Sequence, residues 1–356
     1  MEKERKKVVY EKSSPNTTIQ KTLVTARLFE GFWDRWIAHG IKKSVTNLVN
    51  HEVKKVYDWV RFFNQFADHH FQQATRYEKH HQTQLAEEHF QLAGLYFNLI
   101  YWIFPDRFDE KVTWYKKSLE AFSKADENSR IKRILKTLKI DGKDCVGRVR
   151  VPSHPKGSIV IINPMDSSKE ELYTYENHFV DLGFATFSFD GPGQGETFTI
   201  NGLKANRNRW NQFMNKVITL AYETLPQIPV YLFGTSSGAS WSIEASQHPY
   251  VRKAVAVSPP ISNQNSVALP NYFQERMSYI LEQDPQMLPE TNDLSNCKPV
   301  LLVHGNQDVM VKDSDIYELY NRLPSGKKLI EYHHETHCCN GKLTEIREQS
   351  VRWFND

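Results

Sequence analysis

Residues 230–240 read Val-Tyr-Leu-Phe-Gly-Thr-Ser-Ser-Gly-Ala-Ser, an apolar run that ends in the pattern Gly-x-Ser-x-Gly. β-Branched and aromatic residues favour a strand before Gly234, and the residues after Gly238 favour a helix. A strand, a sharp turn and a helix would expose Ser236 at the apex and place the N–H of Ser237 at a helix N-terminus. The pentapeptide is also compatible with a plain turn, so the rest of the sequence has to distinguish the two.

The composition is that of a globular protein with a large core. The chain has 356 residues, of which 40% are hydrophobic, and its 45 basic and 42 acidic residues give a net charge of +3. This balance argues against a nucleic-acid or membrane-surface partner. The four cysteines show no disulfide or zinc spacing. The N-terminus lacks the apolar core of a secretory signal, so we expect a cytoplasmic protein.

The first part of the chain, 1–127, is predicted to be a helical domain. From about residue 23 to 125, apolar and aromatic residues recur at spacings of three and four, and the pattern predicts four or five helices. The apolar stretch 92–104 is shorter than the ~20 residues that a membrane-spanning helix needs, so it predicts a buried helix. His69, His70, His80 and His81 invite a metal hypothesis, but neighbouring histidines point to different sides of a helix. We expect no metal.

The second part, 128–356, alternates strands and helices, which predicts an α/β fold with a doubly wound, mostly parallel sheet. A hairpin is expected first, around the Asp-Gly turn at 141–142. Six further strands are expected at 158–163, 185–189, 230–233, 254–257, 300–303 and 328–332. Helices are expected at 170–180, 206–225, 237–247 and 314–323. A proline-rich insertion at 259–298, with a helix at 272–281, is too long for a simple connection and predicts a lid.

An acid and a histidine follow two later strands, in the chain order that suits a serine nucleophile. Asp308 follows the strand 300–303, and His337 follows the strand 328–332. Parallel strands bring their carboxyl ends to one edge of the sheet, where Ser236 is also expected. A serine hydroxyl needs a general base and a group that orients this base. We therefore predict Ser236 as nucleophile, His337 as general base and Asp308 as its orienting acid.

Other residues compete for two of these roles. Asp313 and Asp315 are alternative acids, although their positions favour the start of the following helix. His334 is the alternative base, and it stands nearer the strand than His337 does. His304 is expected to be a packed or hydrogen-bonded residue.

The oxyanion of a tetrahedral intermediate needs two hydrogen-bond donors. The N–H of Ser237 is the first candidate, and the second is expected in the loop 163–169 after an earlier strand. Pro164 has no N–H, so Met165 is the candidate in that loop.

Taken together, these motifs resemble the α/β-hydrolases that carry a helical N-terminal domain. The stretches that carry the resemblance are 166–171 (Asp-Ser-Ser-Lys-Glu-Glu), 190–196 (Asp-Gly-Pro-Gly-Gln-Gly-Glu), 234–238, 304–308 and 337–338. The group includes 2,6-dihydroxypseudooxynicotine hydrolase and fungal hydrolases that shorten a naphthopyrone polyketide. The family usually has Gly-Gly where this chain has Asn163 and Pro164.

The resemblance implies hydrolysis of a carbon–carbon bond next to a ketone, without a cofactor, in an aromatic ketone or polyketide of the kind trimmed in bacterial anthraquinone biosynthesis. It also implies a homodimer. A carboxylesterase or thioesterase with the same three residues, and a non-catalytic regulatory binding protein, are the alternative functions.

Overall fold

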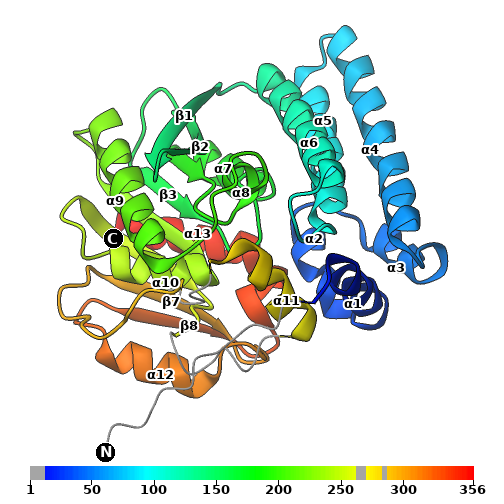
Figure 1. The fold of residues 1–356 in the computed structure, drawn as a ribbon. Helices are drawn as coiled ribbons and strands as arrows, with labels where there is room; N and C mark the ends of the chain where they lie inside the picture. The colour runs from blue at the N-terminus through cyan, green and yellow to red at the C-terminus, as the bar shows by residue number, and fades with distance from the viewer. Residues whose placement is uncertain (1–12, 262–269, 283–286) are drawn as a thin grey trace, which may run out of the picture.

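The computed structural model describes residues 13–261, 270–282 and 287–356. It places a layer of helices beside a domain built around one sheet (Figure 1). Residues 1–12 of the expected helical domain lie outside the described residues, as do 262–269 and 283–286 of the expected lid.

The described chain begins with helices. They are α1 (Pro15–Leu28), η1 (Glu30–Trp33), α2 (Asp34–Ala38), α3 (Lys43–Glu52), α4 (Val56–Lys79), α5 (Thr83–Trp102) and α6 (Asp109–Asn128). The expectation of four or five helices was therefore too low. Helix α1 was not predicted because its buried face includes Thr18 and Thr22 beside Ile19 and Leu23, which interrupts the apolar pattern of a helix.

Aromatic side chains of this layer form its core. The Trp59 ring lies 5.7 Å from Trp33 and 4.8 Å from Phe63, and all three side chains are buried. The predicted buried helix is confirmed, because α5 is buried continuously over its last ten residues. No helix among the described residues has the length and apolar character to cross a membrane.

Within the part of the chain that the structure describes, eight strands form one sheet in the order β1-β2-β4-β3-β5-β6-β7-β8. The hairpin β1 (Arg133–Ile140) and β2 (Lys143–Arg150) is antiparallel, and β2 runs antiparallel to β4 (Ala185–Phe189). The other neighbours are parallel: β3 (Ser158–Ile162), β5 (Val230–Thr235), β6 (Val251–Val257), β7 (Val300–Gly305) and β8 (Lys328–Tyr332). The parallel strands direct their carboxyl ends to one edge, where the site lies.

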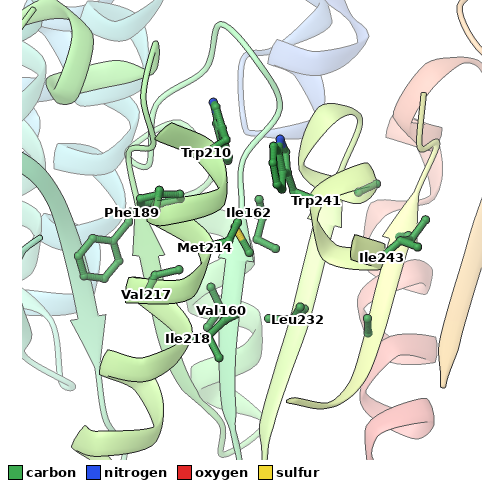
Figure 2. Packing of buried hydrophobic residues seen from close by; sticks show 14 of the residues in the cluster. Val160, Ile162, Phe189, Trp210, Met214, Val217, Ile218, Leu232, Trp241 and Ile243 are labelled. Carbon is green, nitrogen blue, oxygen red and sulfur yellow. The ribbon is translucent and has the colours of Figure 1, made fainter. Parts of the chain in front are cut away.

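Helices cover both faces of the sheet because the central strands alternate apolar side chains between the faces. Val160 and Leu232 pack in the cluster that includes α9 (Arg207–Thr224) and α10 (Ser237–Ala245), as Figure 2 shows. Tyr231 and Phe233 pack on the other face with α7 (Tyr173–Asp181) and α13 (Leu343–Asn355). Buried on both faces, β5 is held rigidly, which fixes the position of the turn that follows it.

Three further helices lie among the described residues. They are α8 (Gly195–Thr199), α11 (Asn271–Ile280) and α12 (Asp313–Arg322), with the 3₁₀ helix η2 (His337–Lys342) before α13. Helix α11 is the predicted helix of the insertion, and it lies against α1. Glu275 of α11 accepts hydrogen bonds from Ser13 at 2.9 Å and Thr18 at 3.0 Å, and it pairs with Lys21.

Candidate active site

The turn between β5 and α10 holds Ser236 in a strained conformation. Its φ of 52° and ψ of −126° lie outside the regions that a side chain adopts easily. A Cβ at Gly234 would lie 2.1 Å from the Gly238 carbonyl oxygen, and a Cβ at Gly238 would lie 2.2 Å from that of Ile162. Both positions therefore require glycine, because backbone atoms fill the space.

Three side chains meet at this turn in one hydrogen-bonded chain. His337 Nε2 lies 2.8 Å from Ser236 Oγ, and His337 Nδ1 lies 2.7 Å from Asp308 Oδ2. The Asp308 side chain is fully buried, and its Oδ1 accepts hydrogen bonds from the N–H groups of Met310 and Val311 at 2.8 and 3.0 Å. Asp308 therefore holds the imidazole with one oxygen and is itself held by the backbone.

The surroundings of the three hydrogen-bonded side chains favour an ionised Asp308 and a basic His337 imidazole. Burial acts to raise the pKa of Asp308, but His337 and two backbone N–H groups outweigh burial and hold this pKa below its ordinary value. Burial acts to lower the pKa of His337, but Cys338 and Asp308 outweigh it and hold this pKa well above its ordinary value. A histidine held in this way is a stronger base towards the Ser236 hydroxyl.

The competing residues lie elsewhere. Asp313 and Asp315 are in the first turn of α12, and Asp313 Oδ1 lies 2.7 Å from His304 Nε2. His304 is fully buried, so its expected role as a packed, hydrogen-bonded residue is confirmed. The His334 side chain is exposed, and the imidazole that contacts Ser236 belongs to His337.

The two residues predicted to hold an oxyanion contact each other. The N–H of Met165 donates to Ser237 Oγ at 2.8 Å. The N–H of Ser237, the first residue of α10, makes no hydrogen bond to any described residue. The structure thus leaves the Ser237 N–H available and directs the Met165 N–H at a side chain.

The loop that carries Met165 is supported by the stretch 190–196. Gln194 Nε2 donates to the carbonyl oxygens of Asn163 at 3.0 Å and Pro164 at 2.8 Å. Ser167 Oγ also donates to the Pro164 oxygen, at 2.7 Å. The expected tight turn at 190–196 therefore supports the loop that carries Met165.

Asp166, the residue after Met165, is held by three side chains that were not predicted from the sequence. Its φ is 62°, in the left-handed region. Arg276 Nε of α11 lies 2.7 Å from Asp166 Oδ2, and the Asp166 carbonyl oxygen accepts from Trp102 Nε1 and Arg35 Nη2, both at 3.1 Å. Helices α2, α5 and α11 therefore converge on one residue beside Met165. A sequence signal was lacking because these partners lie 64 to 131 positions from Asp166.

A buried charged cluster lies behind the same loop. Lys169 Nζ is 2.8 to 2.9 Å from carboxylate oxygens of Glu170, Asp190 and Glu196. Tyr115 of α6 donates to Glu170 at 2.8 Å and to Asp190 at 3.2 Å. Burial raises the pKa of Asp190 to about 6. The cluster joins the helical layer to the sheet domain through Tyr115.

One of the four histidines that invited a metal hypothesis, His70, contacts a histidine outside that set. His70 Nδ1 of α4 lies 3.1 Å from His89 Nδ1 of α5, and burial lowers the pKa of His70 to about 4. Within 13–261, 270–282 and 287–356, no group of three or more His, Cys, Asp or Glu side chains is placed to hold a metal ion.

Comparisons with known proteins agree with this architecture. Residues 153–297 match the sequence profile of Hydrolase_4, described as serine aminopeptidase, S33. The chain is 27% identical over 137 residues to 2,6-dihydropseudooxynicotine hydrolase of Paenarthrobacter nicotinovorans, which covers 38% of this chain and 35% of that protein. It is 32% identical over 103 residues to 20-hydroxy-prefusarin hydrolase of Gibberella moniliformis, which covers 27% and 24%. The matches thus span about a third and a quarter of these relatives.

The structural likeness extends further. The crystal structure of 2,6-dihydroxy-pseudo-oxynicotine hydrolase superposes with a TM-score of 0.76 at 21% identity, over 91% of this chain and 95% of that chain. At this identity the likeness concerns the fold, and it includes the helical N-terminal region. The predicted fold class is confirmed: a mostly parallel sheet, doubly wound, with an N-terminal helical layer. The chain therefore has the fold of the α/β-hydrolases, and its residues 153–297 match the Hydrolase_4 family.

Proposed function

We propose that this protein is a serine hydrolase that cleaves a carbon–carbon bond next to a ketone in an aromatic polyketide, through an acyl-enzyme. The observation that carries the proposal is the hydrogen-bonded chain of Ser236, His337 and Asp308, with contacts of 2.8 and 2.7 Å. Its substrate class rests on the motifs shared with hydrolases of aromatic ketones and polyketides.

In the proposed first step, Ser236 Oγ attacks the ketone carbon while His337 Nε2 accepts the hydroxyl proton. Asp308 stabilises the resulting imidazolium. Two donors stabilise the oxyanion, and the Ser237 N–H is one of them.

Collapse of the tetrahedral intermediate re-forms the carbonyl and breaks the carbon–carbon bond. The electron pair leaves on the carbon, which must be stabilised as an enolate or by a phenol-conjugated ring, and the imidazolium of His337 protonates it. Water, deprotonated by His337, then attacks the ester carbon; the bond to Ser236 Oγ breaks, His337 returns the proton to Oγ, and a carboxylic acid is released. This retro-Claisen scheme needs no redox step and no cofactor.

The test supplies the purified protein with an aryl β-diketone in water labelled with ¹⁸O. We expect a ketone and a carboxylic acid in equal amounts, with one labelled oxygen in the acid. Ser236→Ala should abolish turnover and keep a cooperative unfolding transition. Ser242→Ala is the matched control, because Ser242 is a buried serine of the same helix whose hydroxyl donates to Ala239 and Val255 carbonyl oxygens at 2.8 and 3.0 Å.

Other outcomes favour the alternative functions. Rapid turnover of a chromogenic ester or thioester, with none of the diketone, would point to a carboxylesterase or thioesterase. A cellular phenotype that survives Ser236→Ala would point to a regulatory binding protein.

The proposal includes a cytoplasmic homodimer. Exposed apolar side chains on α1 and α3, namely Val24, Leu28 and Leu48, support an interface there, because such groups mark contact surfaces when they gather. Light scattering on the purified protein should give twice the mass of the 41.6 kDa chain, and a single-chain mass would contradict the proposal.

A further inference from the structure

Hydrogen bonds to the residues before and after Met165 fix the position of its N–H. Gln194 holds the two carbonyl groups before it, and Arg276, Trp102 and Arg35 hold Asp166 after it. A peptide unit between two such anchors has little freedom to rotate when substrate arrives. The direction of this N–H in the structure is therefore its working direction, and it faces Ser237 Oγ at 2.8 Å.

The Ser237 hydroxyl has a proton to donate. Its oxygen accepts from Met165, and among the described residues no acceptor takes the hydroxyl proton. Ser237 is only 4% exposed, so bulk water does not take it readily either. A buried donor without a partner is unfavourable. An unused donor next to a nucleophile therefore indicates a site for a negatively charged oxygen.

We infer that Ser237 supplies both hydrogen-bond donors to the oxyanion, namely its backbone N–H and its hydroxyl. Met165 orients this hydroxyl by donating its N–H to Ser237 Oγ. The inference rests on the proposed function, whose chemistry forms that oxyanion. Both donors belong to one residue at the first turn of α10, where the free N–H groups of the helix favour negative charge. Met165, predicted as a direct donor, becomes a positioning residue.

The arrangement has a chemical reason. A hydroxyl that accepts a hydrogen bond through its oxygen donates more strongly through its proton, because hydrogen bonds in a chain polarise one another. Pro164 removes the N–H before Met165, so the loop has a single donor to offer at this point. The Met165 N–H therefore acts on the substrate carbonyl indirectly: it donates to Ser237 Oγ, and the Ser237 hydroxyl donates to the carbonyl oxygen.

The experiment measures how fast a fluorophosphonate labels Ser236, because this reaction builds negative charge on a phosphoryl oxygen without needing the natural substrate. We expect Ser237→Ala to label about 10²-fold more slowly than the wild type, the loss typical of one oxyanion donor. Ser242→Ala should label within a few-fold of the wild type. Thermal unfolding of both variants checks that each is folded.

A second substitution covers the case in which Ser237→Ala fails to fold. Ser237→Cys nearly preserves the shape but offers a weak S–H donor, so its labelling should also fall at least tenfold. Labelling of Ser237→Ala or Ser237→Cys at or above the wild-type rate would overturn the inference, because Met165 would then be the direct donor. Absence of labelling in the wild type would overturn the proposed function itself, and the inference with it.

Discussion

Removing one partner of the ion pair between Arg276 and Asp166 should cost much more stability than removing one partner of an exposed pair of equal length. The side chains are 1% and 8% exposed, and Nε lies 2.7 Å from Oδ2. The guanidinium also lies 3.8 Å above the Trp102 ring and donates to the carbonyl oxygens of Trp102 and Ile103 at the end of α5. Arg276→Met keeps most of the apolar stem and removes all of these contacts.

The expected cost follows from burial. Removing one partner of a buried pair leaves the other charge unpaired and costs about 3–5 kcal/mol. Arg35 donates to the Asp166 backbone and not to its carboxylate, so it does not replace the lost partner. Against a typical domain stability of about 5–15 kcal/mol, this loss is large.

The assay is urea unfolding of Arg276→Met, Asp166→Asn and the double variant. We expect the double variant to lose less stability than the sum of the two single losses, because each single change leaves a buried partner unsatisfied. The control is Lys139→Met, which breaks the pair with Asp144. Its atoms are also 2.7 Å apart, but the side chains are 68% and 43% exposed, so the expected loss is about 0–1 kcal/mol.

A loss of stability in Arg276→Met no larger than that in Lys139→Met would contradict the expected cost. Simple addition of the two single losses in the double variant would contradict it as well. Fluorophosphonate labelling should slow in Arg276→Met, because Asp166 adjoins the residue that orients Ser237. Arg276→Lys keeps the charge and should restore part of the labelling rate.

Three further outcomes are expected. Gly238→Ala should cost about 3 kcal/mol or more in urea unfolding and abolish labelling, because the new Cβ would lie 2.2 Å from the Ile162 carbonyl oxygen. The value of kcat/KM should fall as pH drops through the raised pKa of His337, because the base must be neutral. Asp308→Asn should lower this pKa, shift the acidic limb of the pH profile to lower pH and reduce kcat by about 10⁴-fold. Burial lowers the pKa of Lys111 to about 7. Between that pH and about 10, the unfolded chain therefore binds a proton that the folded chain has released. The free energy of unfolding of the wild type should rise with pH in this window relative to Lys111→Met, by at most about 1.4 kcal/mol per pH unit.

The sheet and the Ser236 turn could be predicted because their causes are local. Strand residues such as Leu232 and Phe233 alternate between two buried faces, and the glycines around Ser236 are required by backbone contacts within the turn or with the adjacent strand. Asp308 and His337 could be placed because each follows a strand, and parallel strands bring such positions together.

The contacts that support the loop around Met165 could not be predicted in this way. The contact between Met165 and Ser237 spans 72 positions, and the contact between Arg276 and Asp166 spans 110. Neither Arg276 nor Trp102 stands in a motif, and an arginine on a short amphipathic helix ordinarily indicates a solvated face. Only packing of α11 against α5 shows that this arginine is buried.

These contacts give the helical layer a role beyond covering the sheet. Trp102 and Arg35 belong to that layer, Arg276 belongs to the insertion, and all three bind the residue next to Met165. Any shift of α2, α5 or α11 therefore moves the Asp166 backbone, and through it the N–H that orients Ser237. If Ser237 donates to the oxyanion as inferred above, the alignment of these helices and the alignment of the oxyanion donors are coupled. A substitution that loosens the contacts of Asp166 should then lower kcat more than it raises KM, because the donors act only in the transition state.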